Sequence, residues 1–371
     1  MTTILALESS CDETSCAVIT ERDGAFEIKS NIVASQVDTH RLYGGVVPEI
    51  ASRAHIEAIS SITYEAVDKA GVTMDDINAV AVTSNPGLIG ALLVGVNFAK
   101  ALAAANGKPL IAVDHIKGHI AACYLSNSGD APKPPFIALA ASGGHTAIYL
   151  VESYTKTKVI GTTRDDAIGE SFDKIGRIIG IPYPAGAGFD KLSERGFILA
   201  GGADPDGEYT QEEISAFYRK YKKTDSYRDK EMTLPSPALK DDSLDFSFSG
   251  LKTAAINLIH KYDQQERRLP RELFAARYTY EAVEAVARKL GDALKLYPGL
   301  DLAVSGGVAA NSHLRRRLGE VAERAGVKLF IPPLSLCGDN GAMIGAQGYY
   351  EMTAGRFADS SLNASALDSE N

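Results

Sequence analysis

Short apolar runs alternate along the chain with longer stretches of helical periodicity, and this alternation predicts an α/β fold. Strands are expected at 3–7, 16–20, 79–83, 110–113, 136–140, 146–151, 302–304 and 328–331, and helices at 47–70, 88–104, 167–179, 269–296 and 310–325. The chain has 371 residues, which exceeds the size of a typical domain, so two lobes are expected.

A tight turn of small residues follows an apolar run three times, in segments that begin at Leu5, Leu139 and Leu302. The second and third segments continue into the same Ser-Gly-Gly sequence. The recurrence hints at a duplicated α/β lobe, although a match this short is a weak signal of a repeat.

Charge and cysteine usage narrow the class of protein. The net charge of −9 argues against a protein that coats nucleic acid without specificity, but it leaves room for a local basic patch or a basic partner subunit. The four cysteines include no close Cys-x-x-Cys pair, which is typical of a reducing compartment. The chain shows no signal-peptide pattern and no apolar run near the roughly 20 residues that span a bilayer. We therefore expect a cytoplasmic protein without a membrane segment.

Two histidines, His115 and His119, stand four residues apart. On a helix they would share a face with Cβ atoms about 5–6 Å apart, so both imidazoles could reach one transition-metal ion. Two ordinary histidines fit the spacing almost as well, but the chain has only 7 histidines, which favours a function. The spacing also occurs in His-Glu-x-x-His metalloproteases, where the glutamate is the general base. Ile116 occupies that position here, which disfavours a protease.

A metal site needs a third ligand, and Asp339 is the best candidate. It lies between the Pro332-Pro333 loop and an apolar segment with helical character. Its spacing alone fits an N-cap of that helix better than a metal ligand.

Two turns of small residues could hold a ligand through backbone N–H groups. The turn at Ser142, Gly143 and Gly144 could approach phosphate oxygens, although Gly-Gly after a strand is more often a simple hairpin. The segment from Ser305 to Asn311 ends at a helix start, where a nucleotide can lie against the backbone.

Acidic side chains gather in two further segments, and a solvated surface explains each segment when it is taken alone. Asp173 lies on a charged helix face next to the Gly/Pro loop that contains Gly186 and precedes Asp190. Asp12 and Glu13 lie on a turn between two strands, which would face the nucleotide in a phosphate-handling lobe.

Two segments look peripheral. Residues 201–242 are polar and lack clear periodicity, and the basic, aromatic stretch 217–223 within them fits a solvated helix face better than an RNA contact. The tail 359–371 is rich in Ser, Asn and Asp and is predicted to be disordered. The expected division is a first lobe of 1–131 completed by 331–358, and a second lobe of 132–330.

Taken together, these segments closely resemble the TsaD family of bacterial tRNA N6-adenosine threonylcarbamoyltransferases. The family lies within the sugar-kinase/actin/Hsp70-like superfamily. Several strings in the right order are far more specific than any single one. The resemblance covers nearly the whole chain and rests on Glu8–Thr14, Asn85–Gly95, His115–His119, Ser142–Thr146, Asp165–Lys174, Asp245–Lys252, Ser305–Asn311 and Cys337–Ile344.

The resemblance implies a two-lobed fold with duplicated ribonuclease-H-like lobes and a specific reaction. Threonylcarbamoyl-adenylate would donate its threonylcarbamoyl group to N6 of adenosine 37 in tRNAs that read codons beginning with A, and AMP would leave. One divalent metal ion, Fe²⁺ ahead of Zn²⁺, would sit on His115, His119 and Asp339. The implied substrate-binding residues are Ala140, Ala141, Ser142, Gly143, Gly144, Asp173, Gly186, Asp190 and Asn311.

The resemblance also implies partners: a smaller, metal-free actin-like paralogue (TsaB-like) and a P-loop ATPase (TsaE-like). Asp12 and Glu13 are candidates for orienting the amine or accepting its proton. The loop at 184–188 lacks the family's usual Gly-Gly-Pro, so the register of Gly186 and Asp190 is less secure. Two alternatives remain, a small-molecule O-carbamoyltransferase or kinase on the same fold, and an actin-like assembly module.

Overall fold

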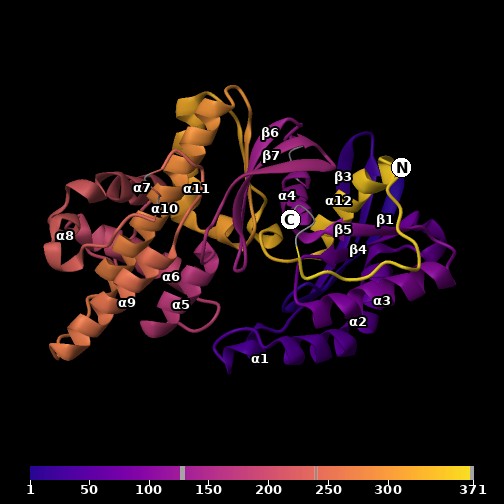
Figure 1. The fold of residues 1–371 in the computed structure, drawn as a ribbon, viewed down its shortest axis with the longest axis horizontal. Coiled ribbons are helices and arrows are strands. Elements are labelled where there is room, and N and C mark those ends of the chain that lie inside the picture. Colours follow the sequence, from indigo (N-terminus) through magenta and orange to yellow (C-terminus); the bar gives the residue numbers. More distant parts are fainter. Residues whose placement is uncertain (126–129, 238, 240, 368–371) are drawn as a thin grey trace.

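Two five-stranded sheets, one in each lobe, organise the chain (Figure 1). The computed structural model describes residues 1–125, 130–237, 239 and 241–367. The first sheet contains β1 (Thr2–Glu8), β2 (Glu13–Arg22), β3 (Ala25–Ser35), β4 (Ala79–Asn85) and β5 (Leu110–Asp114). The second contains β6 (Phe136–Ala141), β7 (Thr146–Ser153), β8 (Lys156–Thr162), β9 (Leu302–Ser305) and β10 (Leu329–Phe330).

The two sheets repeat one topology. The strand order is β3-β2-β1-β4-β5 in the first sheet and, from the other edge, β8-β7-β6-β9-β10 in the second. In each lobe the first three strands are antiparallel neighbours, and the last two run parallel to the first. The expected two-lobed α/β fold with a duplicated lobe is therefore confirmed. Of the recurring turns, those after β1 and β6 end equivalent strands, whereas the second Ser-Gly-Gly turn follows β9, which is equivalent to β4.

Helices connect and cover the strands. In the first half of the chain they are α1 (Val37–Arg41), α2 (Pro48–Ala70), η1 (Met74–Asp76), α3 (Ile89–Ala105), α4 (His115–Ala121) and η2 (Ala122–Tyr124). The second lobe contributes α5 (Ile168–Ile178), α6 (Gly186–Ala200), α7 (Gln211–Lys220), η3 (Tyr221–Lys223), α8 (Asp225–Arg228), η4 (Lys230–Met232), α9 (Ser249–Gln264), α10 (Arg271–Leu296), η5 (Gly307–Ala310) and α11 (Ser312–Ala325). The chain then forms η6 (Leu334–Leu336) and α12 (Gly341–Thr353).

The first sheet is buried on both faces, by helices from distant parts of the chain. Successive side chains of a strand point to opposite faces. Leu5 and Leu7 of β1 join one hydrophobic cluster with residues of α2 and α3, whereas Ile4 and Ala6 join another with residues of α12. Helix α12 thus packs on the first sheet although it follows the second lobe in sequence. The exact boundaries of the two lobes stay a prediction.

The segment 201–242 differs from the expected aperiodic insertion, because part of it contributes to the core of the second lobe. Thr210 and Glu213 form a capping box that begins α7, and Ile214, Tyr218 and Tyr221 follow at helical spacing and are buried. The neighbouring Lys222 and Lys223 are exposed, as expected for a solvated helix face. The aromatic residues of this stretch therefore stabilise the fold.

The C-terminal segment predicted to be disordered, 359–371, is described as far as residue 367, and this part packs on the first lobe. The carbonyl of Leu362 accepts a hydrogen bond from Lys100 Nζ at 3.0 Å, and Ser365 N–H donates to the carbonyl of Ser84 at 2.9 Å. Leu362 and Ala364 contact the cluster formed with α2 and α3. Burial of these two apolar side chains anchors an otherwise polar segment on the first lobe.

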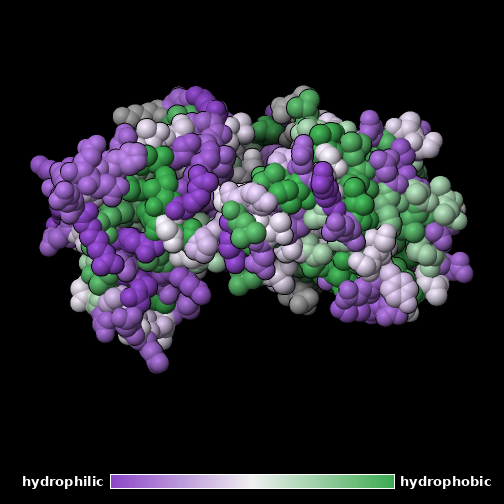
Figure 2. All heavy atoms as spheres, turned by 90° about the horizontal axis from the view of Figure 1, so that it is seen from below, coloured by the Kyte–Doolittle hydropathy of each residue, from purple (hydrophilic) through white to green (hydrophobic). Residues whose placement is uncertain are grey.

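Hydrophilic and hydrophobic residues are distributed unevenly over the surface. Viewed from below, the helical part of the second lobe is predominantly hydrophilic, whereas hydrophobic residues are more frequent over the first lobe (Figure 2). Within the described part of the chain, no helix combines the length and the apolar character that crossing a membrane requires.

Candidate metal centre and substrate site

Helix α4 places the two histidines on one buried face. It begins at His115 because Asp114, at the end of β5, accepts hydrogen bonds from the backbone N–H groups of Ile116 at 2.9 Å and Lys117 at 3.1 Å. The imidazole rings of His115 and His119 lie 4.5 Å apart between centroids. The predicted pairing of these histidines on one helix face is therefore present.

Asp339 completes a cluster with the two histidines. Its Oδ1 lies 3.2 Å from His119 Nε2 and 3.6 Å from His115 Nε2, and the three candidate ligand atoms lie within 4.8 Å of one another. The competing interpretation of Asp339 as an N-cap is wrong, because Asn340 caps α12 by accepting a hydrogen bond from Met343 N–H. Asp339 is thereby left to face α4.

Close helix packing brings Asp339 to the histidines. A Cβ at Gly118 would lie 2.7 Å from Ile344 Cδ1 of α12. Glycine at this position weakens α4 as a helix but allows α12 to approach it.

A second layer of side chains fixes the orientation of His115. Its Nδ1 lies 3.0 Å from Glu8 Oε2 and 3.1 Å from Ser10 Oγ, and Thr83 Oγ1 donates to the same Glu8 oxygen at 2.6 Å. These contacts assign the proton to Nδ1 and leave Nε2 free for an ion. A carboxylate that holds a histidine in this way is the usual support of a metal ligand.

The electrostatics of the cluster favour a bound cation. Burial alone would lower the pKa of His115, but Asp339 and Glu8 outweigh it and raise the pKa to about 9. The pKa of Asp339 is lowered well below its usual range, because the attraction of His115 and His119 outweighs burial. The two carboxylates therefore favour a positive charge at this site. In the protein without a metal ion the proton on His115 carries that charge, and a bound metal ion would carry it instead.

His119 is a buried imidazole with an unsatisfied ring nitrogen, and coordination of a metal ion would satisfy this side chain. The residue is 1% exposed, its Nδ1 has no hydrogen-bond partner among the residues that the structure describes, and its Nε2 has none beyond its contact with Asp339 Oδ1 at 3.2 Å. A buried polar group without a partner costs about 1–3 kcal/mol. Two imidazoles and one carboxylate are donors suited to Fe²⁺ or Zn²⁺ with positions left for substrate. The residues present fit such an ion.

The candidate acids Asp12 and Glu13 lie beside this cluster but differ in environment. Burial, followed by the charges of Asp339 and Asp12, raises the pKa of Glu13 to about 9. This environment therefore favours the protonated form of Glu13. Asp12 is 7% exposed and its Oδ2 accepts a hydrogen bond from the Tyr183 hydroxyl of the second lobe at 3.4 Å.

The turn at Ser142 is the simple hairpin that sequence analysis allowed as an alternative. Ala141 of β6 pairs with Thr146 of β7, and Ser142 N–H donates to the carbonyl of His145 at 2.8 Å. Gly143 and Gly144 at its tip are exposed, and a Cβ at either would meet no atom within 4 Å. An exposed tip with open space around it can still present backbone N–H groups to a ligand.

The second Ser-Gly-Gly turn packs closely against the end of β6, just before the first turn. Gly306 has a φ of +88° and lies so close to β6 that a Cβ would be 2.3 Å from the carbonyl oxygen of Ala141. A Cβ at Gly169, near the start of α5, would be 2.4 Å from the carbonyl oxygen of Ser142. Ala140 and Ala141, which precede the turn, are both buried.

The remaining predicted substrate residues form two pairs at helix starts. Asp173 Oδ1 accepts a hydrogen bond from Ala185 N–H at 2.7 Å, just before Gly186 begins α6. Asp190 Oδ2 accepts from Ser312 N–H at 3.1 Å, next to Asn311, which caps α11. These contacts give each acid a structural role, and their contact with substrate stays a prediction.

Two residues near the site were not singled out by sequence. Burial lowers the pKa of His145 to about 4, and His115 and His119 act in the same direction, which places this neutral imidazole near the pair. It directly follows the Gly-Gly turn, which is the signal that could have identified it. Tyr183 lies near Asp12 only in the folded chain, and no local sequence pattern identifies Tyr183 as a site residue.

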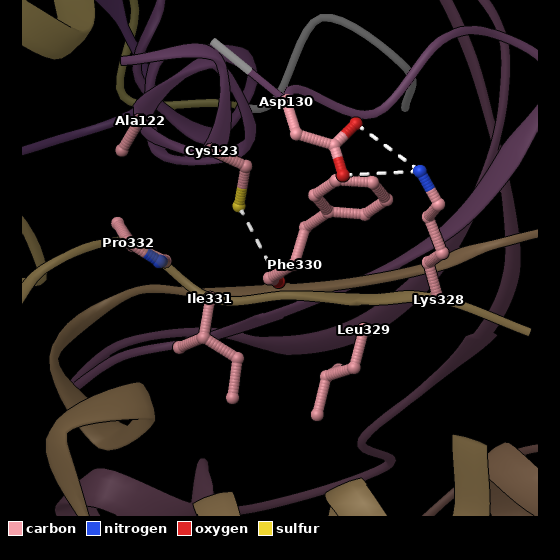
Figure 3. A pocket seen from close by; sticks show the side chains of 8 residues that line it. All are labelled: Ala122, Cys123, Asp130, Lys328, Leu329, Phe330, Ile331 and Pro332. Atoms are coloured by element: carbon pink, nitrogen blue, oxygen red, sulfur yellow. Dashed lines mark hydrogen bonds and ion pairs between the residues drawn. The ribbon is translucent and has the colours of Figure 1, made fainter. Parts of the chain in front are cut away.

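A pocket of about 400 Å³ lies apart from this cluster, beside η2 and β10. Figure 3 shows the residues that line it: Ala122, Cys123, Asp130, Lys328, Leu329, Phe330, Ile331 and Pro332. Lys328 Nζ and Asp130 Oδ2 point toward each other at 3.0 Å. Burial raises the pKa of the Cys123 thiol to about 12, so this side chain is not a reactive thiolate.

Replacing the buried His313 near Asp190 with glutamine is expected to make the protein less sensitive to acid. Burial lowers the pKa of His313 from 6.5 to about 3, and Arg316 adds to this effect. Between these values the unfolded chain binds a proton that the folded chain excludes, so stability falls as pH falls. From pH 7 to pH 5 the loss from this residue should be about 2 kcal/mol, and the variant should lack it.

Urea unfolding of both proteins at the two pH values measures this difference. Glutamine in place of the exposed His260 is the matched control and should leave the pH dependence unchanged. An equal acid dependence in wild type and the His313 variant would contradict the prediction.

The fold and the site define a two-lobed, actin-like α/β protein that carries a His-His-Asp cluster suited to a metal ion. The solved structure of HypF from T. kodakarensis has a similar fold, with a TM-score of 0.55 and 12% sequence identity. The similarity covers 99% of this chain and 49% of that chain.

Sequence similarity then identifies the family. The model of the TsaD family, described as tRNA N6-adenosine threonylcarbamoyltransferase, matches residues 27–346. A relative of that name from Clostridium botulinum (strain 657 / Type Ba4) is 44% identical over 361 residues, covering 97% of this chain and 96% of the relative. Another from Clostridium perfringens (strain 13 / Type A) is 42% identical over the same shares. The chain belongs to the TsaD family.

Proposed function

We propose that this chain transfers the threonylcarbamoyl group of threonylcarbamoyl-adenylate to N6 of adenosine 37 in tRNAs that read codons beginning with A, with release of AMP. The observation that carries the proposal is the buried cluster of His115, His119 and Asp339, in which His119 has no other partner among the described residues. The name shared by the relatives supplies the substrate and the transferred group.

The donor in this reaction is already activated, so the protein needs no strong nucleophile. A mixed anhydride requires that the donor be bound, that the adenine amine be placed in line, and that charge on the oxygens be stabilised. The exposed backbone N–H groups of Gly143 and Gly144 are suited to hold the donor's oxygens. An Fe²⁺ or Zn²⁺ ion on His115, His119 and Asp339 would supply Lewis-acid stabilisation of the same charge.

Asp12 is the better of the two candidate proton acceptors. Its carboxylate accepts a long hydrogen bond from the Tyr183 hydroxyl at 3.4 Å and also interacts with the side chains of Cys11 and Glu13. The pKa of Glu13 is raised to about 9 by burial and by the charges of Asp339 and Asp12, which makes it the less suitable base. An aromatic amine is weakly basic and loses its proton only as the new bond forms, so a nearby carboxylate suffices.

The test is a transfer assay with defined components. We expect the chain, a TsaB-like paralogue and a TsaE-like ATPase, given threonylcarbamoyl-adenylate and unmodified tRNA, to form the modified nucleoside with one AMP released per transfer. Mass spectrometry of digested tRNA measures the product. Carbamoylation of a small alcohol with no product on tRNA would contradict the proposal. We place the reaction in the cytoplasm, in agreement with four cysteines that form no disulfide.

A further inference from the structure

The loop that joins α1 to α2 is held rigidly from inside by one histidine. His40 is 0% exposed, its Nε2 lies 3.1 Å from Gln36 Oε1, and its Nδ1 accepts a hydrogen bond from Val47 N–H at 3.2 Å. The backbone N–H groups of Tyr43 and Gly45 both donate to the carbonyl of His40. The side chains at the tip of this loop are therefore presented in fixed positions.

The tip of the loop exposes large hydrophobic side chains. Leu42 is 83% exposed and Tyr43 is 58% exposed. Among the described residues, no aromatic ring packs against Tyr43 and no hydrogen bond from its hydroxyl is formed. A single exposed hydrophobic residue is ordinary, but two neighbours on a pinned loop form a surface that is available for contact.

The loop reaches the second lobe beside the proposed active site. Arg41 Nε donates to the carbonyl of Tyr183 at 3.1 Å, and Arg177 Nη1 donates to the carbonyl of Gly44 at 3.4 Å. The hydroxyl of the same Tyr183 contacts Asp12. Tyr183 therefore contacts both Arg41, at the base of the loop, and Asp12, one of the acids near the His-His-Asp cluster.

The surface around the tip mixes apolar and cationic side chains. Next to Arg177, which is exposed, Ile178 is 42% exposed. Figure 2 looks at the side of the molecule where α1 lies in Figure 1 and shows hydrophobic residues among hydrophilic ones near the middle of this face. Arg177 contacts the backbone of Gly44, the residue that follows Tyr43. Aromatic rings and arginines are the groups on which unpaired bases stack.

We propose that Tyr43, with Leu42 and Arg177, binds unpaired nucleotides that flank the target adenosine in the anticodon loop of tRNA. The inference rests on the proposed function and adds to it the residues that receive the RNA. Single-stranded bases offer a flat face to any aromatic side chain, and Arg177 can contact a base or a phosphate.

A protein partner fits this surface less well than RNA. Specific protein interfaces involve about 20–30 residues a side, whereas the tip offers a few side chains. Arg41 forms an ion pair with Asp38 at 3.1 Å, so the local positive charge comes from Arg177, in a chain with a net charge of −9. Charge and size both match a short stretch of nucleotides.

The first test measures the concentration of tRNA required for half-maximal transfer by the assembled enzyme. We expect Tyr43→Ala to raise KM for tRNA about 5-fold to 100-fold, as expected for the loss of one stacked base, with KM for the donor unchanged. Tyr43→Phe should retain the wild-type value because the ring remains. Phe357, which is 57% exposed, provides the matched control: Phe357→Ala should change neither constant.

The second test uses the absence of tryptophan from the sequence. Tyr43→Trp introduces a single tryptophan, whose fluorescence can be excited selectively, and we expect an anticodon stem-loop RNA to quench it in the 371-residue chain, whereas Phe357→Trp should not respond. An unchanged KM for tRNA in Tyr43→Ala overturns the inference. So does a raised KM that excess partner subunit restores, because the contact would then be with protein. If wild type itself transfers nothing to tRNA, the proposed function fails instead.

Discussion

Replacing His119 with alanine is expected to empty the metal site and to lower the rate of transfer to tRNA by about 10²- to 10³-fold. Within the described part of the chain, the ring nitrogens of His119 have no partner outside the cluster, in which Asp339 Oδ1 lies 3.2 Å from Nε2, and this is the strongest indication of a bound ion. The variant keeps Glu8, His115 and Asp339 and should fold. Elemental analysis gives the metal-to-protein ratio, and single-turnover assays give the rate.

The matched control for this experiment is His260→Ala, which removes an exposed histidine from α9. It should keep both the metal content and the rate of wild type. Asp339→Asn should resemble the His119 variant, because the amide is a far weaker ligand than the carboxylate. A His119 variant with full metal content and an unchanged rate would exclude this residue as a ligand.

Replacing Gly306 with alanine is expected to destabilise the protein by about 2–5 kcal/mol. Two effects add: the φ of +88° is unfavourable for alanine, and the new Cβ would lie 2.3 Å from the carbonyl oxygen of Ala141. Relief of that overlap would move the end of β6, so KM for threonylcarbamoyl-adenylate should also rise. Urea unfolding measures the stability, and initial rates at varied donor concentration measure KM.

Gly307 provides the internal comparison, because a Cβ there would meet no atom within 4 Å. Gly307→Ala should therefore unfold within about 1 kcal/mol of wild type. Equal unfolding of the two alanine variants would show that the approach of the two Ser-Gly-Gly turns is not required.

The buried strands and the parallel edge strands β5 and β10 were predictable from sequence, whereas the antiparallel edge strands β3 and β8 were not. β1 is almost wholly buried and appears as an unbroken apolar run. β3 and β8 alternate exposed and partly buried residues because one of their faces meets water, and no run of apolar residues marks them. Helix α6 was not among the predicted helices, and the support of its start is not local: Asp173, twelve residues earlier, accepts the hydrogen bond of Ala185.

The candidate site was likewise predictable only where a local sequence pattern encodes it. The His115 and His119 pair depends on helix periodicity, which a local pattern reveals. Whether Asp339 was a ligand or a cap depended on its neighbour, since Asn340 takes the capping role only in the folded helix. Contacts such as that of Tyr183 with Asp12 join the two lobes, and no spacing in the sequence encodes them.

The position of Asp339 on the segment that leads into α12 has a consequence for how the protein matures. Two ligands are synthesised early and the third more than two hundred residues later, after the chain has passed through the whole second lobe. A nascent chain released before that point lacks the third ligand and the helix that seals the first sheet. Metal loading would therefore report that the second lobe has been synthesised and that the returning segment has docked on the first lobe.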